Sequence, residues 1–286
     1  MVASVRQETA SAWTAAASTT VTTPAFGSAC LSGSLIEVYV IWGSNTNPSS
    51  VADSASQTYS IGASVADNND GLTLAIFVFS NNASTTALTV TSTWATAPGF
   101  QGIWAKELTG VSSAPYQTSV GLNQVSPGGG TDAITSGNLT PTAQPFLLSS
   151  LSFEDGGNLA SSAGTGFTLG TTGWSLAGSG NANSTTSESK RVTGSLSALA
   201  ATYTNATDGP TRRMLTIAAS YTELNAPAIV PTVGSITSST SAPTVTPATA
   251  TVITPFVARK HERIIAMERQ LLVPDRKIFL PSRRVA

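Results

Sequence analysis

Short apolar segments separated by turn-forming residues make up the first 224 residues of the chain. The segment "SLIEVYVIWGS" is apolar at almost every position from Leu35 to Trp42, and "GLTLAIFVFSN" repeats this character after "DNNDG". In "ALTVTSTW" apolar and polar residues alternate, with Leu88 and Val90 on one face. Alternation indicates a strand with one buried face, whereas an unbroken apolar run of strand length indicates a central strand buried on both faces.

Four further segments have the same character, and the expected set is at least eight strands: "FQGIWAKELTGV", "PFLLSSLSFED", "GFTLGTTGWSL" and "RRMLTIAASYTEL". The intervals between the segments show no helical pattern, which favours an antiparallel sandwich over βαβ units. A jelly roll fits the strand count and the length. We therefore predict an all-β fold, an antiparallel, jelly-roll-like β-sandwich that covers residues 1–224.

A different kind of sequence follows in residues 225–255, which contain no charged residue and five prolines. Most of the rest is Thr, Ser, Val and Ala, and such a stretch cannot bury enough apolar surface to fold alone. Proline biases it toward extended structure at about 3.1 Å per residue, so it could span up to roughly 90 Å. We predict that this segment is a Pro/Thr/Ser-rich linker.

The last segment, residues 256–286, carries an apolar triplet every seven residues, at Ile264–Ala266, Leu271–Val273 and Ile278–Leu280. This spacing suggests a coiled coil, but Pro274 and Pro281 would each cost a helix about 3 kcal/mol. Short extended segments that bend at each proline fit better. Because exposed apolar segments are unfavourable in water, the tail is expected to pack on its own domain, on copies of itself or on another protein.

Charged residues make up only 10% of the chain, against about 25% in an average globular protein. This scarcity also favours strands, because a surface helix normally needs a charged polar face. The net charge of −1 hides an uneven distribution: residues 256–286 hold eight basic and three acidic residues, and the first 255 hold six basic and twelve acidic ones. The sequence thus indicates a weakly acidic body with a basic tail.

Residue types that support catalysis or metal binding are scarce. His261 is the only histidine and falls in the tail, and Cys30 is the only cysteine, so an intrachain disulfide and a His/Cys metal cluster are both excluded. Cys30 is expected to be a buried small hydrophobic residue. The glycine-rich "SPGGGTD" lacks the lysine of a phosphate-binding loop. We predict a protein that is not an enzyme and that uses no cofactor or metal.

Two acidic spots have simpler explanations than chemistry. "DNNDG", from Asp67 to Gly71, has oxygen ligands like a calcium loop, but Val78 stands where the EF-hand pattern needs Glu, so a tight turn is expected. In "FEDGG", Glu154 and Asp155 are adjacent on a strand and point to opposite faces, so they are not expected to cooperate as a glycosidase pair. A solvated strand end is expected there.

The tryptophans fall into two groups. Trp42 and Trp104 sit inside strongly apolar segments and are expected in the core. Trp94 in "TSTWATAPGF" and Trp174 in "TTGWSLAG" lie nearer turns. Since exposed aromatic rings can stack on sugars, Trp94 and Trp174 are candidates for contact with a host surface glycan.

A basic tail could bind nucleic acid, a membrane or a protein. The tail lacks regular interleaving of aromatic and basic residues, and its arginines stand near Glu262, Glu268 and Asp275, which argues against nucleic acid. Proline-broken segments make a poor amphipathic helix for a membrane surface. Apolar triplets suit burial in a protein, so protein partners are predicted, and neither nucleic acid nor membrane. The N-terminal residues also lack the apolar run of a secretory signal peptide.

Three segments of the body resemble a β-sandwich module common in tailed-phage virion proteins and some bacterial surface proteins. The "G-D-L-L-V"-like core strand of that module is similar to "GSLIEVYVIW", with Ser34 in place of Asp. A later strand with tryptophan, glutamate and Gly-Val matches "IWAKELTGV", from Trp104 to Val111. Its final strand resembles "RRMLTIAASYTEL", with Met214 in place of tryptophan. The resemblance covers residues 1–224 and implies a virion structural protein.

The tail independently resembles a repeat of the form D-R-x-[IVL]-x-V-P in phage virion proteins, which "ERQLLVP" and "DRKIFLP" match. The resemblance implies equivalent positions for Arg269, Arg276 and Arg283, with Leu271, Ile278 and Val285 as apolar anchors. The seven residues before these two rows of the repeat, "HERIIAM", depart from it, with Glu262 in place of Arg and Met267 in place of Pro.

These observations lead to the hypothesis of a tailed-phage virion protein, made in the host cytoplasm and most similar to head decoration or head-fibre proteins. The sandwich would project on the linker, and the tail would anchor it in the capsid or neck, with a homo-oligomer, for example a homotrimer, as one way to bury the triplets. The residues expected to form the anchor are Arg263, Ile264, Arg269, Leu271, Leu272, Arg276, Ile278, Phe279 and Arg283. The alternative is a tail-associated adhesin that binds host glycans.

Overall fold

The computed structural model describes residues 1–11, 18–44, 46–67, 71–126, 130–155, 161–170, 184–194, 199–207, 212–224, 271–273 and 276–278. All regular secondary structure in these residues is β-strand, which confirms the all-β prediction. None of them forms a helix long and apolar enough to cross a membrane. The chain divides into two compact units, Met1–Val230, called the body below, and Pro231–Ala286, called the C-terminal unit.

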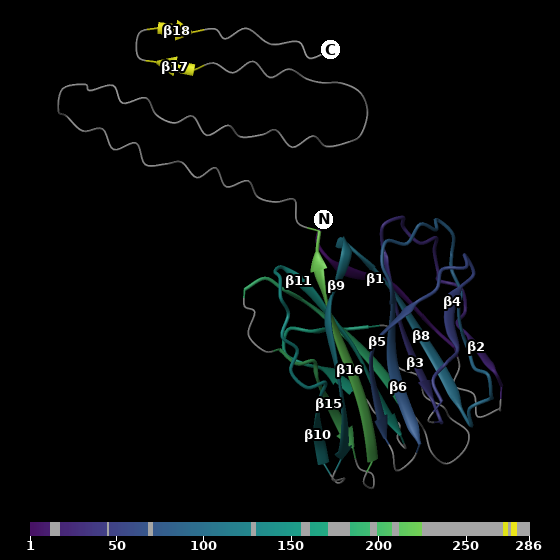
Figure 1. Cartoon of the computed structure of the whole chain (residues 1–286). Coiled ribbons are helices and arrows are strands. Elements are labelled where there is room, and N and C mark those ends of the chain that lie inside the picture. The colour runs from purple at the N-terminus through teal and green to yellow at the C-terminus, as the bar shows by residue number, and fades with distance from the viewer. Residues whose placement is uncertain are drawn as a thin grey trace. The chain divides into compact units, whose positions relative to one another are not determined.

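The first half of the body consists of eight strands in two sheets (Figure 1). The strands are β1 (Ser4–Ala10), β2 (Thr20–Thr22), β3 (Leu35–Trp42), β4 (Ser50–Asp53), β5 (Ser60–Asp67), β6 (Leu72–Phe79), β7 (Val90–Thr93) and β8 (Gln101–Thr109). The order β1-β8-β3-β6-β5 forms what we call inner sheet 1, and the order β2-β7-β4 forms outer sheet 1. All neighbouring strands in both sheets are antiparallel.

This arrangement is that of a jelly roll, except that β5 pairs with β6 at the edge of inner sheet 1 and not with β4. In a jelly roll, eight antiparallel strands are shared between two facing sheets through two Greek keys. Here β1, β8, β3 and β6 are neighbours in one sheet, and β2, β7 and β4 in the other. A bridge between Ala52 and Thr58 brings the segment before β5 alongside β4, and β5 then joins the edge of inner sheet 1. The jelly-roll-like sandwich that the sequence predicts is thus present within the first half of the body alone.

The second half of the body repeats the same topology. Its strands are β9 (Val111–Ser126), β10 (Gly130–Thr135), β11 (Phe146–Asp155), β12 (Ser161–Ala163), β13 (Thr168–Leu169), β14 (Ser184–Val192), β15 (Thr202–Thr207) and β16 (Arg212–Glu223). Inner sheet 2 has the order β9-β16-β11-β14-β13, and outer sheet 2 has the order β10-β15-β12. Adding eight to each strand number of the first half gives both orders, so the body is a tandem pair of jelly rolls joined at Gly110.

The two inner sheets pack face to face, so the body has four layers. Tyr39 and Ile41 of β3 share one apolar core with Leu151 of β11 and Ile217 of β16. The opposite face of β3, including Trp42, joins a second core with outer sheet 1. A third core, which includes Tyr203, lies between inner sheet 2 and outer sheet 2. The prediction that the segment 35–42 is a central strand buried on both faces is confirmed, since all eight residues of β3 are buried.

The two jelly rolls meet differently at the two seams of their inner sheets. Along one seam β5 lies against β9, where Asn123 Nδ2 donates to the carbonyl of Ala66 at 3.2 Å and a Cβ at Gly121 would lie 2.9 Å from Val65. Along the other seam β1 faces β13 and β14. Because β13 has two residues where its counterpart β5 has eight, this second seam is less covered by strand.

The C-terminal unit contains one described element, an antiparallel pair of the strands β17 (Leu271–Val273) and β18 (Arg276–Ile278). The two strands are extended segments, as predicted, and Pro274 between them lies outside the described residues. The predicted linker, residues 225–255, lies outside the described residues.

Gly110 and Gly33 offer a test of how tightly the junction between the two jelly rolls is packed. Both have positive φ, +72° and +84°, but a side chain at Gly110 would overlap the backbone of Val2, whereas Gly33 has nothing within 4 Å. We expect Gly33→Ala to lower the free energy of unfolding by about 1 kcal/mol, the cost of a left-handed backbone. Gly110→Ala must also displace the N-terminal strand and should cost roughly 3 kcal/mol or more. Urea denaturation measures both, and equal losses would contradict the packing at this junction.

Candidate functional site

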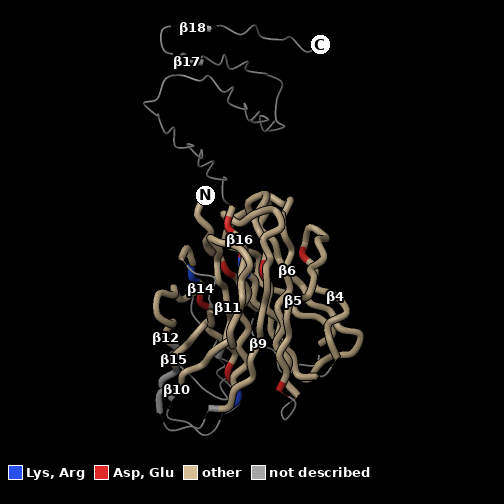
Figure 2. The backbone as a smooth tube through the Cα atoms, turned by 60° about the vertical axis from the view of Figure 1, so that its left-hand side comes forward, with Lys and Arg blue, Asp and Glu red and all other residues tan. Residues whose placement is uncertain are grey.

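Most charged side chains of the body whose burial is described are buried. The carboxylates whose burial is described are all buried, and they are Glu8, Glu37, Asp53, Asp67, Glu107, Glu154, Glu188 and Glu223. Arg6, Arg191 and Arg213 remain partly exposed. Figure 2 shows how few charged positions the described part of the body carries. The body has more acidic than basic residues, but its described residues therefore do not form an acidic surface.

Three of these charges form a row across inner sheet 1, on the face that packs against the second jelly roll. Glu8 of β1 is the cross-strand partner of Lys106 of β8, and Lys106 is the cross-strand partner of Glu37 of β3. Lys106 Nζ lies 4.0 Å from Glu8 Oε1 and 3.7 Å from Glu37 Oε2. The side chains of Lys106 and Glu37 are 0% exposed, and that of Glu8 is 4% exposed. We call these three residues the charged row.

The second jelly roll supplies hydroxyl groups to the charged row. Ser149 Oγ donates to Glu37 Oε2 at 2.5 Å, and Tyr221 Oη donates to Glu37 Oε1 at 2.8 Å. Ser187 Oγ donates to Glu8 Oε1 at 3.0 Å. Lys106 Nζ in turn donates to Ser149 Oγ at 3.0 Å and to the carbonyl of Ser150 at 2.9 Å. The buried charges are thus paired with one another and hydrogen-bonded across the two sheets, as burial requires.

Tyr39 completes the surroundings of Glu37. Its hydroxyl donates to Glu37 Oε1 at 3.0 Å, and Lys106 Nζ lies 5.1 Å from the centre of its ring. Burial and the neighbouring carboxylate of Glu37 hold the pKa of both Tyr39 and Tyr221 well above the usual value for tyrosine. Both hydroxyls therefore keep their protons and remain donors to Glu37.

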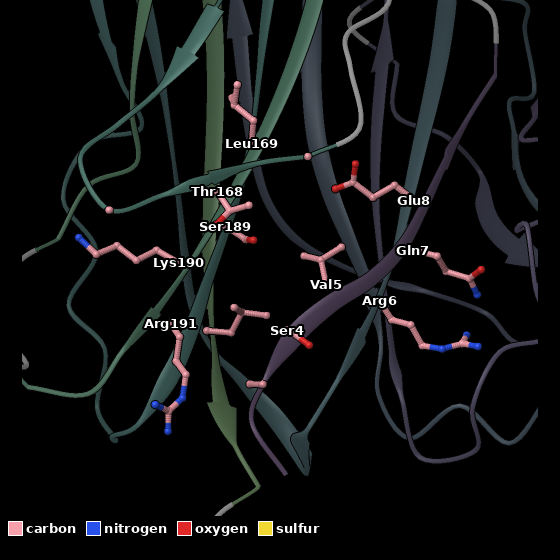
Figure 3. Close-up of a pocket in the computed structure, with 14 residues that line it drawn as sticks. Ser4, Val5, Arg6, Gln7, Glu8, Thr168, Leu169, Ser189, Lys190 and Arg191 are labelled. Carbon is pink, nitrogen blue, oxygen red and sulfur yellow. The ribbon is translucent and has the colours of Figure 1, made fainter.

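A groove of about 390 Å³ opens at the seam between β1 and the strands β13 and β14 (Figure 3). Val5, Thr168 and Ser189 are among its lining residues, and Arg6 and Gln7 extend on the side away from Thr168 and Ser189. Glu8 belongs both to this lining and to the charged row. A side chain at Gly170 would overlap Ser187 and Glu8, so glycine at this position lets the chain approach the carboxylate closely.

The chemistry available in the groove is narrow. Acid/base hydrolysis of a sugar needs two carboxylates on either side of an accessible substrate. Among the described residues the groove contains one carboxylate, Glu8, and the next one in the row, Glu37, lies beyond Lys106. No group of three or more His, Cys, Asp or Glu that could hold a metal ion occurs in the described ranges. The groove therefore reaches the charged row at Glu8.

Another buried carboxylate, Glu188 of β14, fixes the second jelly roll. It accepts hydrogen bonds from the backbone N–H of Gly164 at 2.9 Å and of Thr202 at 3.0 Å. Burial raises its pKa from the ordinary 4.5 to about 7, although these two N–H groups oppose the rise. The carboxylate thus connects the turn after β12 to the start of β15. Its pKa lies near neutral pH.

The predicted glycan contact by Trp94 is wrong. Trp94 is 2% exposed and packs with Trp42 in the core between inner sheet 1 and outer sheet 1, their ring centres 6.3 Å apart. Trp94 directly follows β7, and its backbone N–H donates to the carbonyl of Thr19 at 2.8 Å. The chain is therefore still held along outer sheet 1 at this residue, and the ring lies in the core. Trp174, the other candidate, lies outside the described residues.

Other predictions can be compared with the structure residue by residue. Trp42, Trp104 and Cys30 are buried in the core, as predicted. The solvated strand end predicted at Glu154 is wrong, since Glu154 is 2% exposed within β11. Asn68–Asp70 of the predicted turn lie outside the described residues, but Gly71 has the positive φ, +67°, typical of a turn glycine.

The predicted anchor residues fall partly within β17 and β18. Leu271 and Leu272 belong to β17, and Arg276 and Ile278 belong to β18. The others, Arg263, Ile264, Arg269, Phe279 and Arg283, lie outside the described residues.

Sequence reasoning did not single out the charged row, although one signal for it is present. Glu37 and Lys106 are isolated charges within the apolar segments "LIEVYVIW" and "IWAKELT". A charge in a strand that is buried on both faces must have a buried partner. Comparison of the chain with protein-family models, with curated proteins and with solved structures found no match in any of the three. The function is therefore argued from the residues themselves.

Replacing Trp94 tests its place in the core. We expect Trp94→Ala to lower the free energy of unfolding by about 3–5 kcal/mol, the usual cost of removing a buried tryptophan. Leu31→Ala, at a residue that is 45% exposed, is the control and should cost about 0.5 kcal/mol. A small effect of Trp94→Ala in chemical denaturation would show that its ring is not part of the core.

The raised pKa of Glu188 predicts a pH dependence of stability. Between pH 4.5 and about 7 the folded protein keeps a proton on Glu188 that the unfolded chain has lost. The contribution of Glu188 to stability is therefore fully present below pH 4.5 and is lost as the pH rises through 7. Glu188→Gln, which mimics the protonated form, should gain stability relative to the wild type over this range. Denaturation at a series of pH values measures the difference, and a constant difference would contradict the assignment.

Proposed function

We propose that this chain is a structural protein of a tailed-phage virion, of the head decoration or head-fibre kind. The tandem jelly-roll body is the displayed part, and the C-terminal unit is the anchor that binds another virion protein of the capsid or neck. Homo-oligomers, including trimers, would provide further burial for the tail.

The observation that carries this proposal is the separate C-terminal unit with strands in its repeats. Two rows that resemble the phage repeat, "ERQLLVP" and "DRKIFLP", contain β17 and β18. Each strand has three residues, and a two-stranded hairpin of this length is marginal in water without further packing. A partner surface that buries the apolar residues of these rows would stabilise them.

The charge distribution supports a partner other than the body. The tail carries eight basic residues. The carboxylates of the body whose burial is described are buried and hydrogen-bonded or ion-paired, so they do not offer an acidic surface to the tail. An acidic surface on a second protein would provide the complementary charge. The host-glycan alternative loses one of its two predicted contacts with the burial of Trp94.

Deleting residues 256–286 tests the anchor. We expect a folded body that no longer enters virions, as measured by the protein content of purified particles, because the anchor is missing while the cores of the body are intact. Far-UV circular dichroism of the truncated protein provides the folding control.

A pair of single substitutions sharpens this test. Arg276→Ala and Lys277→Ala each remove one positive charge from β18, but only Arg276 occupies a fixed position of the repeat. Arg276→Ala should lower incorporation several-fold, and Lys277→Ala should leave it nearly unchanged. Normal incorporation of the truncated protein, or equal effects of the two substitutions, would contradict a repeat-specific anchor.

A further inference from the structure

The charged row brings an amine and a carboxylate together in the way that amide formation requires. Lys106 and Glu37 are direct cross-strand partners, and Lys106 Nζ lies 3.7 Å from Glu37 Oε2. A second carboxylate, Glu8, stands on the other side of the same amine at 4.0 Å. We propose that Lys106 and Glu37 condense into an intramolecular isopeptide bond, with Glu8 as the base that takes a proton from Lys106. The body would thus form its own covalent cross-link between β8 and β3.

The reaction balances without any added reactant. Glu8 takes a proton from the Lys106 ammonium, and the free amine attacks Cδ of Glu37. A bond forms between Nζ and Cδ, and the bond between Cδ and one carboxylate oxygen breaks. That oxygen leaves as water with two protons from the Lys106 nitrogen, one of them held in turn by Glu8. Ser149 Oγ, which accepts from Lys106 Nζ at 3.0 Å and donates to Glu37 Oε2 at 2.5 Å, relays the protons to the leaving oxygen. One carboxylate and one ammonium become one neutral amide and one water, and Glu8 returns to its starting state.

The contacts of Glu37 suit the attack. Tyr39 and Tyr221 donate to Oε1 and Ser149 donates to Oε2, so three hydroxyls surround the carboxyl group on which negative charge develops. Fixed donors aimed at such an oxygen are the usual way in which proteins stabilise a tetrahedral intermediate. The reacting atoms are also held close by two packed sheets, which supplies the effective concentration that an unassisted amine and acid lack in water.

The surroundings favour the product as well. A buried ion pair is costly because both ions have lost their hydration, and condensation removes both charges. The product amide N–H would lie near the Glu8 carboxylate, which can accept its hydrogen bond. Glu8 also lines the groove between β1 and β14, so the released water has a route out of the core.

The cross-link would connect residues far apart in the sequence. It would close a loop from Glu37 to Lys106 within inner sheet 1. This sheet packs against outer sheet 1 on one face and against inner sheet 2 on the other. Because Cys30 is the only cysteine, an intrachain disulfide cannot serve this purpose. A displayed protein would gain resistance to unfolding without depending on an oxidising environment.

Trypsin digestion of the denatured full-length protein tests the bond directly. Lys106 is the only Lys or Arg between Arg6 and Lys190, and trypsin does not cleave after an acylated lysine. The cross-linked protein should have an intact mass lower by one water, and it should yield a single peptide 7–190. Cleavage at Lys190 in the same digest shows that the protease had access. A full sequence mass together with separate peptides 7–106 and 107–190 would overturn the proposal.

Glu8→Gln separates the proton transfer from the fold. Glutamine keeps an acceptor for Ser187 but cannot take a proton from Lys106. The variant should therefore remain folded, and most of its molecules should keep the full sequence mass, without the loss of water. Incubation at neutral pH should show the water loss slowed at least tenfold relative to the wild type. An unchanged rate in a folded Glu8→Gln variant would overturn the role of Glu8, and the wild-type mass decides on the bond itself.

Discussion

The face-to-face burial of the two inner sheets is the constraint on which the rest of the body depends. It places Lys106 and Glu37 where neither can reach water, so each charge needs partners inside the protein. Those partners come from both jelly rolls: Glu8 and Tyr39 from the first, and Ser149, Ser187 and Tyr221 from the second. A shift of one sheet over the other would leave a buried charge unpaired, which costs several kcal/mol. The charged row therefore fixes the register between the two halves.

The two halves share a topology but differ in the chemistry of their inner faces. The first contributes the three ions of the charged row, and the second contributes to that row neutral hydroxyls and the carbonyl of Ser150. The seams differ too, since β5 and β9 are in contact while a groove remains between β1 and β14. This difference places Glu8, at one end of the charged row, in the lining of the groove. The carboxylates of the body whose burial is described lie inside it.

The strongest strands were predictable from sequence, and the duplication was not. β3 and β6 are apolar at all positions but one each, Glu37 in β3 and Thr73 in β6, and burial on both faces follows from that pattern. β9 reads "VSSAPYQTSVGLNQVS", in which polar residues dominate, so its place in a sheet depends on its partner β16 and not on its own periodicity. The counterparts "LIEVYVIW" and "FLLSSLSFED" share little sequence, which hid the repeat. The charged row could not be predicted without the strand order β1-β8-β3, because only that order brings Glu8, Lys106 and Glu37 together.

The account's central claim is that the inner interface makes the two jelly rolls one cooperative unit. Four of the five tryptophans, Trp13, Trp42, Trp94 and Trp104, precede Gly110, so tryptophan fluorescence reports mainly on the first jelly roll, whereas far-UV circular dichroism reports on both. The most direct measurement is equilibrium denaturation of the full chain followed by both signals in the same samples. Coincident transitions with a single midpoint are predicted. A second transition in circular dichroism that fluorescence does not show would contradict the claim, since the second jelly roll would then unfold independently of the first.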